Sequence, residues 1–285
     1  MIETGLWRKT LIASKIAALA PAFALGLPAQ WLALRAAPPL ARWLPVYFHR
    51  YLLFVLGVRV ERIGAPDPRK PLLIAANHLS WLDILVISSL FPVSFIAKSE
   101  VGSWPLFGTL ARLQRSIFVE RQRRGKTAEV NRDIAERLQL GDALVLFAEG
   151  TTSDGTRILP FRSALIGAVQ AVTGQEKSGQ EDRGPQKPEP AVSYLQPLSI
   201  AYPRIGGLPI GRENHPLIAW YGDMDLLPHL ADFFTLPGVD CRVTLLPAIE
   251  VGQNHDRKAM TRQIEADIRA THARTLTGRH HQNVG

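Results

Sequence analysis

The chain has 285 residues, with 33 Lys and Arg against 25 Asp and Glu, so its formal charge is +8, and 46% of it is hydrophobic. These figures exclude a disordered chain, a collagen and a disulfide scaffold, and they allow one large or two small domains with a buried core. The single cysteine, Cys241, excludes an intrachain disulfide bond and a cysteine-rich metal site. The basic balance points to two classes of partner, which are nucleic acid and an anionic membrane surface.

The basic excess lies in the first quarter of the chain. Residues 1–70 contain ten basic and three acidic side chains and carry +7, whereas the rest of the chain carries +1. Residues 16–34 are an uncharged run of 19 residues, close to the roughly 20 that span a bilayer core. Two prolines interrupt this run, and a second apolar stretch follows at 43–58. We therefore expect residues 1–58 to form membrane-anchoring helices, either a hairpin or an in-plane amphipathic pair, with a single span as the alternative.

From residue 59 onward, short apolar runs alternate with helical patterns. The runs predict strands at 59–63, 72–76, 93–97, 116–119, 143–148, 193–202, 217–220 and 241–249, and helices at 81–89, 126–140, 165–172 and 256–276. This alternation predicts an α/β domain over 59–277, with a mostly parallel or mixed sheet flanked by helices, preceded by the N-terminal membrane-associated helical hairpin. Residues 173–191 contain no large apolar side chain, so we expect a mobile loop there, and we expect a disordered tail at 278–285.

The first candidate site follows the predicted buried strand at 72–76. His78 comes two residues after this strand, and Asp83 follows five residues later. Five residues turn an ideal helix through about 500°, so these two side chains would not share a helix face. We therefore expect His78 in the loop and Asp83 in the first turn of the next helix, where its carboxylate can reach one imidazole nitrogen and raise the basicity of the ring. Ser80 and Asp83 also match a helix-capping pair, so a purely structural role for Asp83 stays open.

Three more stretches carry polar residues at predicted strand ends. They are RSIFVER at 115–121, FAEGTTS at 147–153 and YLQPLSIAY at 194–202. With Asn77, His78 and Asp83, they follow the order and approximate spacing of the four sequence blocks of the glycerolipid acyltransferase family. The chain resembles bacterial 1-acyl-glycerol-3-phosphate acyltransferases over about residues 60–250.

This resemblance implies a membrane-bound O-acyltransferase. It would move a fatty acyl group from acyl carrier protein or coenzyme A to the free hydroxyl of a lysophospholipid, in the first instance converting 1-acyl-glycerol-3-phosphate to phosphatidic acid. His78 would be the general base and Asp83 its orienting partner. The residues implied in substrate binding are Lys98, Glu120, Arg121, Glu149, Gly150 and Thr151, with Pro197 shaping the acyl-donor side. The resemblance implies no cofactor besides the thioester, and it implies the cytoplasmic face of a bacterial inner membrane. We expect no nucleic acid partner because the basic excess flanks apolar runs, and no metal because His78 and Asp83 offer two ligands with no obvious third.

The third block departs from the family pattern at two positions. Ala148 replaces a proline, and Thr152 replaces an arginine that would suit a phosphate. Arg157 or Arg162 can supply this charge, or the acceptor lacks the phosphate. The stretches at 147–155 and 220–230 are similar to acyltransferases that complete ornithine lipids, so a lyso-ornithine lipid is the alternative acceptor.

Two further alternatives stay open. A membrane-anchored lipid hydrolase would use His78 and Asp83 to activate water. Trp104, Leu106 and Phe107 would either line a groove for an acyl chain or belong to the ordinary core.

Overall fold

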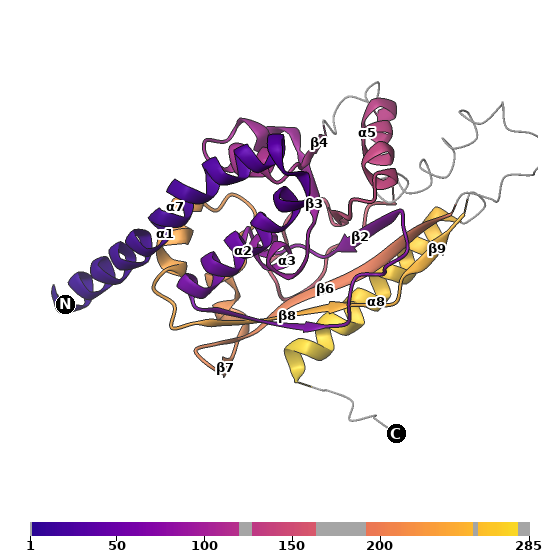
Figure 1. Ribbon diagram of the computed structural model, residues 1–285. Coiled ribbons are helices and arrows are strands. Elements are labelled where there is room, and N and C mark those ends of the chain that lie inside the picture. Colours follow the sequence, from indigo (N-terminus) through magenta and orange to yellow (C-terminus); the bar gives the residue numbers. More distant parts are fainter. Residues whose placement is uncertain (1, 120–126, 164–191, 253–255, 279–285) are drawn as a thin grey trace, which may run out of the picture.

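The computed structural model describes residues 2–119, 127–163, 192–252 and 256–278 and arranges them in layers around one sheet (Figure 1). The helices are α1 (Ile2–Ala36), α2 (Pro38–Leu56), α3 (Leu82–Leu90), α4 (Phe107–Leu113), α5 (Thr127–Gln139), α7 (Leu226–Phe233) and α8 (Arg257–Thr277), with short 3-10 helices η1 (Ser99–Ser103) and η3 (Arg212–Leu217). The strands are β1 (Val58–Ile63), β2 (Leu72–Ala76), β3 (Ser94–Lys98), β4 (Ile117–Val119), β5 (Leu144–Phe147), β6 (Ser193–Ile205), β7 (Leu208–Pro209), β8 (Val239–Leu245) and β9 (Ile249–Val251).

The sheet is mixed, as the sequence predicts. Its main order within the described residues is β1-β8-β6-β2-β5-β3-β4, and β7 and β9 pair with β6. The strands from β6 to β4 in this order are mutually parallel, whereas β8 is antiparallel to β6 and β1 is parallel to β8. The carboxyl ends of β2, β3, β4 and β5 therefore meet at one edge of the sheet, which is where open α/β sheets bind ligands.

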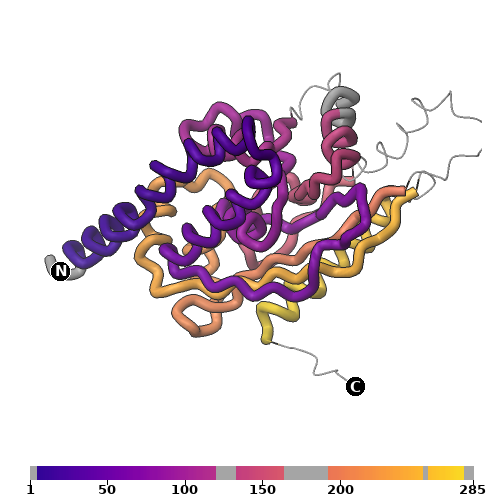
Figure 2. Tube along the Cα trace, in the orientation of Figure 1, coloured from indigo at the N-terminus to yellow at the C-terminus, as the bar shows by residue number. Residues whose placement is uncertain are grey.

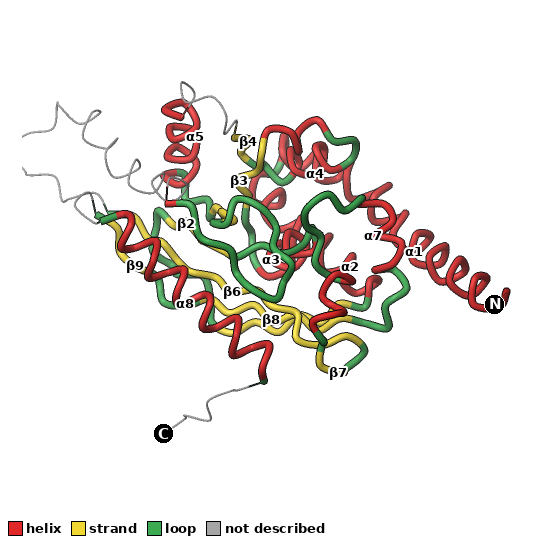
Figure 3. The backbone as a smooth tube through the Cα atoms, turned by 180° about the vertical axis from the view of Figure 1, so that it is seen from behind, coloured by secondary structure: helices red, strands yellow, loops and turns green. Residues whose placement is uncertain are grey.

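Alternate residues of the central strands supply the two cores. In β2, Leu72, Ile74 and Ala76 pack with residues of α2, α3 and α7 on one face. Leu73 and Ala75 pack with residues of α5 and α8 on the other. Figure 3, in which the molecule is seen from behind, shows α8 lying across this second face of the sheet. Since β2 is buried on both faces, its sequence is a continuous apolar run without polar alternation.

The two N-terminal helices form a hairpin. Only Ala37 separates α1 from α2. The two helices are antiparallel, because residues earlier in α1 contact residues later in α2. The rings of Phe23 and Phe48 lie 5.3 Å apart, and the Tyr51 hydroxyl donates to the Ala18 carbonyl oxygen at 2.8 Å. Figure 2 shows the N-terminal end of α1 projecting beyond the rest of the molecule.

The hairpin carries most of the exposed apolar surface of the described residues. Eleven of the seventeen exposed large hydrophobic side chains lie on α1 and α2: Leu6, Trp7, Ile16, Leu25, Trp31, Leu32, Leu40, Trp43, Tyr47, Tyr51 and Phe54. One described helix, over residues 5–36, is long and apolar enough to cross a membrane, and none of its most apolar window is buried. A soluble protein rarely exposes so large an apolar patch, so the hairpin indicates membrane association.

Two strand predictions are wrong. Residues 217–220 are apolar, but Leu217 ends η3 and the residues after it run as a loop, in which the Trp220 N–H donates to the Leu79 carbonyl oxygen at 2.8 Å. Ile218 and Ala219 are buried outside the sheet, and apolar composition alone does not distinguish this from a buried strand. The predicted strand at 241–249 is two strands, β8 and β9, separated at Pro247. The predicted helix at 165–172, the predicted loop at 173–191 and nearly all of the predicted tail lie outside the described residues.

Candidate active site

His78 and Asp83 meet at the carboxyl end of β2. His78 lies in the loop after the strand, and Asp83 lies in the first turn of α3. The distance from Nδ1 of His78 to Oδ2 of Asp83 is 2.8 Å. The same oxygen accepts the backbone N–H groups of Leu79 at 2.7 Å and Ser80 at 2.9 Å. Asp83 therefore contacts both the loop backbone and the imidazole, so the geometry needed for each of the two predicted roles is present.

Tyr202 completes the surroundings of the Asp83 carboxylate. Its hydroxyl, on β6, donates to Oδ1 of Asp83 at 2.7 Å. Asp83 is 0% exposed and Tyr202 is 2% exposed, so this hydrogen bond is made in a nearly water-free environment. Burial raises the pKa of the Tyr202 phenol well above its ordinary value, and the Asp83 charge adds to this effect. The phenol thus stays a donor to the carboxylate at any physiological pH.

The sequence reasoning missed Tyr202. It lies 119 residues from Asp83 in the chain, and its stretch was considered only for Pro197. The one available signal is its place at the end of the predicted strand at 193–202, in the fourth sequence block.

The imidazole ring is also fixed from its face. The ring of His78 stacks on Phe147 at 3.7 Å with an interplanar angle of 11°, and Phe147 stacks in turn near Phe95 at 5.8 Å. The backbone carbonyl oxygen of His78 accepts the Ser153 N–H at 2.9 Å. The side chain of His78 remains 17% exposed, so a substrate atom can still approach the ring.

Glu149 braces the same loop from the end of β5. Oε1 accepts the His78 N–H at 2.7 Å, and Oε2 accepts the Leu159 N–H at 2.7 Å. Glu149 is only 2% exposed. Burial raises the pKa of its carboxyl to about 7, although the two N–H donors oppose the change. Both oxygens are therefore committed to the backbone.

The remaining predicted site residues are distributed along this edge of the sheet. Gly150 is buried and has a φ of 74°, a left-handed conformation that favours glycine. Thr151 is exposed beside it, and Lys98 is exposed at the end of β3. Glu120 and Arg121 directly follow β4 in the sequence, but they lie outside the described residues.

Pro197 lies within β6, in register with Ala75 of β2. The antiparallel pairing of β6 with β9 ends at Leu195, and its pairing with β8 begins at Leu198. The Pro197 carbonyl oxygen accepts the Leu246 N–H at 2.9 Å. The nitrogen of Pro197, which has no hydrogen to donate, faces the gap between β8 and β9. A proline is tolerated in the strand for this reason.

An apolar surface borders the His78 loop. Trp220, whose N–H binds the Leu79 carbonyl, lies 6.0 Å ring to ring from Trp104. Trp104 is 37% exposed and Leu106 is 48% exposed, whereas Phe107 begins α4. The two exposed side chains are therefore not ordinary core residues.

The arrangement has the parts of a general base. Because a carboxylate oxygen only accepts hydrogen bonds, Nδ1 of His78 is the protonated nitrogen, and Nε2 carries the free lone pair. Cys241 is 2% exposed, and burial raises the pKa of its thiol well above the ordinary value. That environment opposes formation of a thiolate nucleophile.

The chain is similar to characterised acyltransferases along most of its length. A family model described as Acyltransferase matches residues 58–181. The lyso-ornithine lipid O-acyltransferase of Brucella abortus is 44% identical over 253 residues, covering 89% of this chain and 90% of that protein. That of Rhizobium meliloti is 42% identical, covering 89% and 82%. The 1-acyl-sn-glycerol-3-phosphate acyltransferase of Neisseria meningitidis is 32% identical, covering 78% and 77%.

A solved structure shares the fold. The crystal structure of the 1-acyl-sn-glycerophosphate acyltransferase from Thermotoga maritima aligns with a TM-score of 0.65, 17% identity and 99% coverage of both chains. At this identity, the likeness supports the architecture alone.

Proposed function

The chain belongs to the acyltransferase family, and we propose that it transfers a fatty acyl group from a thioester to the free hydroxyl of a lysolipid, with His78 as general base. The observation that carries the proposal is the hydrogen bond of 2.8 Å from Nδ1 of His78 to the buried carboxylate of Asp83. It orients the ring and leaves Nε2 to accept a proton.

The reaction needs one nucleophilic displacement. Nε2 of His78 accepts the proton of the lysolipid hydroxyl as its oxygen attacks the thioester carbonyl carbon. The carbon–sulfur bond then breaks, and the imidazolium returns the proton to the departing thiolate, so that an ester and a thiol leave. Since a thioester is already activated, one base together with correct positioning is sufficient.

Glu149 acts in this scheme as a positioning residue. Its two oxygens tie the His78 backbone to the segment at Leu159. A loop that is held at both ends keeps the imidazole in one place, which general-base catalysis requires. Acceptor binding then falls to other residues, for which we propose Lys98 and Thr151, both exposed at this edge, together with Gly150 and Arg121.

We propose a lyso-ornithine lipid as the preferred acceptor. Two relatives named for that activity are 44% and 42% identical to this chain, whereas two relatives named for 1-acyl-sn-glycerol-3-phosphate are each 32% identical. Thr152 supports the choice, because a neutral side chain occupies the place where the glycerolipid acyltransferase pattern has an arginine. Lysophosphatidic acid is the second candidate, supported by Arg157 and Arg162 in the following loop.

The acyl donor and the membrane side complete the proposal. The donor is acyl carrier protein or coenzyme A thioester, and the acyl chain lies along the exposed surface at Trp104 and Leu106. The hairpin of α1 and α2 attaches the enzyme to the bacterial inner membrane, with the catalytic edge on the cytoplasmic side. A thioester made in the cytoplasm then meets a lipid hydroxyl at the membrane surface.

The deciding experiment offers purified enzyme both acceptors in the same mixed micelles, with each thioester donor in turn. We expect radiolabelled acyl groups to appear mainly in ornithine lipid, and the release of free fatty acid to stay at the background rate. A majority of label in phosphatidic acid would overturn the acceptor assignment. A majority in free fatty acid would favour a hydrolase.

A further inference from the structure

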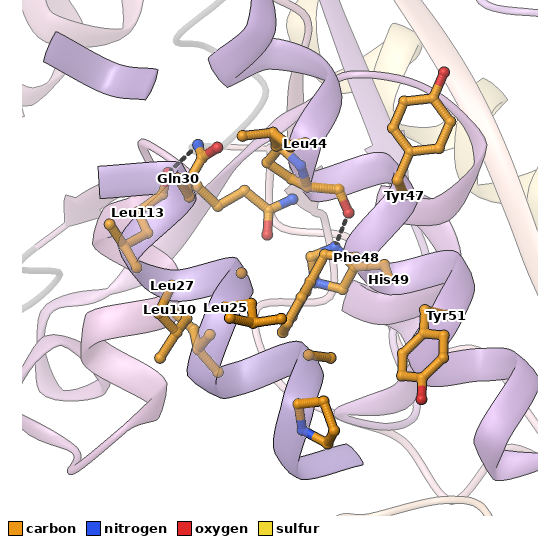
Figure 4. Close-up of a pocket in the computed structure, with 15 residues that line it drawn as sticks. Leu25, Leu27, Gln30, Leu44, Tyr47, Phe48, His49, Tyr51, Leu110 and Leu113 are labelled. Atoms are coloured by element: carbon orange, nitrogen blue, oxygen red, sulfur yellow. Dashed lines mark hydrogen bonds between the residues drawn. The ribbon is translucent and has the colours of Figure 1, made fainter. Parts of the chain in front are cut away.

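An apolar cavity lies inside the N-terminal hairpin. Its volume is about 450 Å³, and it is bounded by α1, α2 and α4 (Figure 4). Side chains such as Leu44, Phe48 and Leu110 form its wall. Leu25 and Tyr47, which also line it, are 73% and 60% exposed, so the cavity opens on the apolar surface of the hairpin. It has the size and lining that suit a hydrocarbon chain.

Gln30 brings an unsatisfied acceptor to this cavity. The residue is 6% exposed. Its Nε2 donates to the carbonyl oxygens of Ala41 at 3.0 Å and Leu113 at 2.9 Å. These two bonds fix the orientation of the amide, since a flipped amide would place an oxygen against two carbonyls. Oε1 of Gln30 is left buried without a donor. A hydroxyl or N–H group of a bound molecule would satisfy it.

A basic cavity adjoins the apolar one. Its volume is about 320 Å³, and Gln30, Pro45, Leu113 and Gln114 line both cavities. The charged side chains in its wall are Arg42, Lys70, Arg115 and Asp142.

The cations of the basic cavity outnumber its single acid. Asp142 already pairs with Arg42 at 2.8 Å, with Arg115 at 3.1 Å, and with Arg137, which is not in the cavity wall, at 2.7 Å. Lys70 has no ion pair within the described residues. The excess of positive charge in a partly enclosed cavity attracts an anion, and guanidinium groups suit phosphate oxygens in particular.

The basic cavity lies far from the catalytic edge, and the apolar cavity shares four lining residues with it. Lys70 precedes β2, Ser94 begins β3 and Ala143 precedes β5, so the basic cavity borders the amino ends of these strands. His78 follows the carboxyl end of β2. Five residues of strand separate the two edges by about 16 Å. The cavities are therefore a second site and not a part of the acyl-transfer site.

We propose that the two cavities together bind an anionic phospholipid of the membrane that is not a substrate. Its acyl chain lies in the apolar cavity, its phosphate lies against Arg42, Lys70 and Arg115, and a hydroxyl of its head group donates to Oε1 of Gln30. Trp43 lines the basic cavity and Tyr47 lines the apolar one, and both side chains are about half exposed. Tryptophan and tyrosine are enriched at the depth of the lipid head groups in membrane proteins. A lipid held there ties the hairpin to α4 and to the sheet.

The test measures lipid binding by the full-length enzyme in detergent, without an acyl donor. The probes are phosphatidylglycerol and phosphatidylcholine that carry the same fluorescent acyl chain. We expect phosphatidylglycerol to bind about tenfold more tightly. Both lipids carry the phosphate, but phosphatidylcholine adds a quaternary ammonium that the cations of the basic cavity repel, and it has no head-group hydroxyl to donate to Oε1 of Gln30. Equal affinity for the two lipids would overturn the proposal.

The variants locate the site. Lys70→Gln should weaken phosphatidylglycerol about tenfold and reduce its preference over phosphatidylcholine, which carries no net negative charge. Lys70→Arg should restore binding, and Gln30→Leu should weaken phosphatidylglycerol severalfold. Arg35→Gln, which removes an exposed cation of α1 outside both cavities, is the matched control and should bind as the wild type does. Lys70→Gln with unchanged affinity would contradict the proposal, and this variant alters only an exposed loop residue, so misfolding does not obscure the result.

Two further arms identify the ligand and separate this site from the proposed active site. Inorganic phosphate should fail to displace the bound lipid, and full displacement would assign the cavity to a free anion. His78→Ala should bind phosphatidylglycerol normally whether or not it retains activity. If His78→Ala loses the lipid, the lipid occupies the catalytic edge and the second site is disproved.

Discussion

The hydroxyl of Tyr202, within β6, donates a hydrogen bond of 2.7 Å to Oδ1 of Asp83, in the first turn of α3. Oδ2 of the same carboxylate receives His78 and two backbone N–H groups. Four donors therefore converge on one buried acid. In the proposed mechanism, the sheet holds the carboxylate, and the carboxylate holds the base.

Tyr202→Phe tests this coupling between the sheet and the base. The variant keeps the ring and removes one hydrogen bond to a buried charge, so we expect a loss of about 2 kcal/mol in the free energy of unfolding. We expect kcat to fall about tenfold with an unchanged KM, because the base is displaced while the substrate sites remain. Chemical denaturation and steady-state kinetics measure the two effects.

Cys241→Ala is the control for that variant. Its thiol contacts the Tyr202 hydroxyl from the neighbouring strand, so the mutation disturbs the same core region without touching Asp83 directly. We expect nearly wild-type kcat. If the two variants lose kcat equally, the effect reflects packing and not the bond to Asp83.

Asp83→Asn should lower kcat by at least about a hundredfold, since a carboxylate partner orients the histidine and stabilises the imidazolium. An amide presents only one acceptor oxygen where the carboxylate presents two. Asp67→Asn removes a carboxylate at the opposite edge of the sheet, beside Arg69, and serves as the control. Activity of Asp83→Asn within threefold of the wild type would show that Asp83 only caps the loop.

The pKa of Glu149 predicts how stability depends on pH. It is raised from 4.5 to about 7 in the folded protein, so the folded state binds a proton that the unfolded state has released between these values. The contribution of Glu149 to stability should therefore be fully present below pH about 4.5 and should fall by about 3 kcal/mol as the pH rises to about 7.

Glu149→Gln isolates this contribution. Residue 149 of the variant cannot titrate, so the difference in free energy of unfolding between the wild type and the variant should fall by about 2 kcal/mol between pH 5 and pH about 7.5. Glu149→Gln should also be less stable than the wild type at low pH, because the NH2 group of the glutamine would face the backbone N–H of either His78 or Leu159. Parallel pH curves for the two proteins, measured by denaturant unfolding, would contradict the assignment.

Thr152→Arg tests the acceptor assignment. A guanidinium at this position should favour a phosphate head group, so the ratio of kcat/KM for lysophosphatidic acid to that for lyso-ornithine lipid should rise about tenfold. Thr156→Arg adds the same charge at an exposed position of the same loop and should leave the ratio unchanged. If both variants change the ratio equally, the effect is a general one of charge, and Thr152 does not define the head-group site.

The parts of the site that were predictable from the sequence are those formed by residues close together in the chain. A buried strand, a loop and a helix start place His78 and Asp83 together, and the hydrogen bond between them follows from five residues of spacing. Tyr202 was not predicted, because its approach to Asp83 depends on β6 lying beside β2. The carboxyl end of β5 was placed correctly, but the bond of Glu149 to the Leu159 backbone leaves no pattern in the sequence.

The incorrect strand at 217–220 has a similar cause. Ile218 and Ala219 are 1% and 0% exposed, so their burial was inferred correctly. Their partner is the loop that carries His78, and a covering loop and a central strand need the same apolar composition. The hairpin of α1 and α2 was predictable because an exposed apolar helix pair differs from a soluble core in composition and charge.

The central claim is that Nε2 of His78 removes the acceptor proton, and His78→Ala tests it most directly. We expect kcat for acyl transfer to fall by at least about a hundredfold, while KM and the thermal unfolding temperature stay close to wild-type values. A His78→Ala enzyme that folds normally and keeps more than about a hundredth of the wild-type kcat would contradict the account.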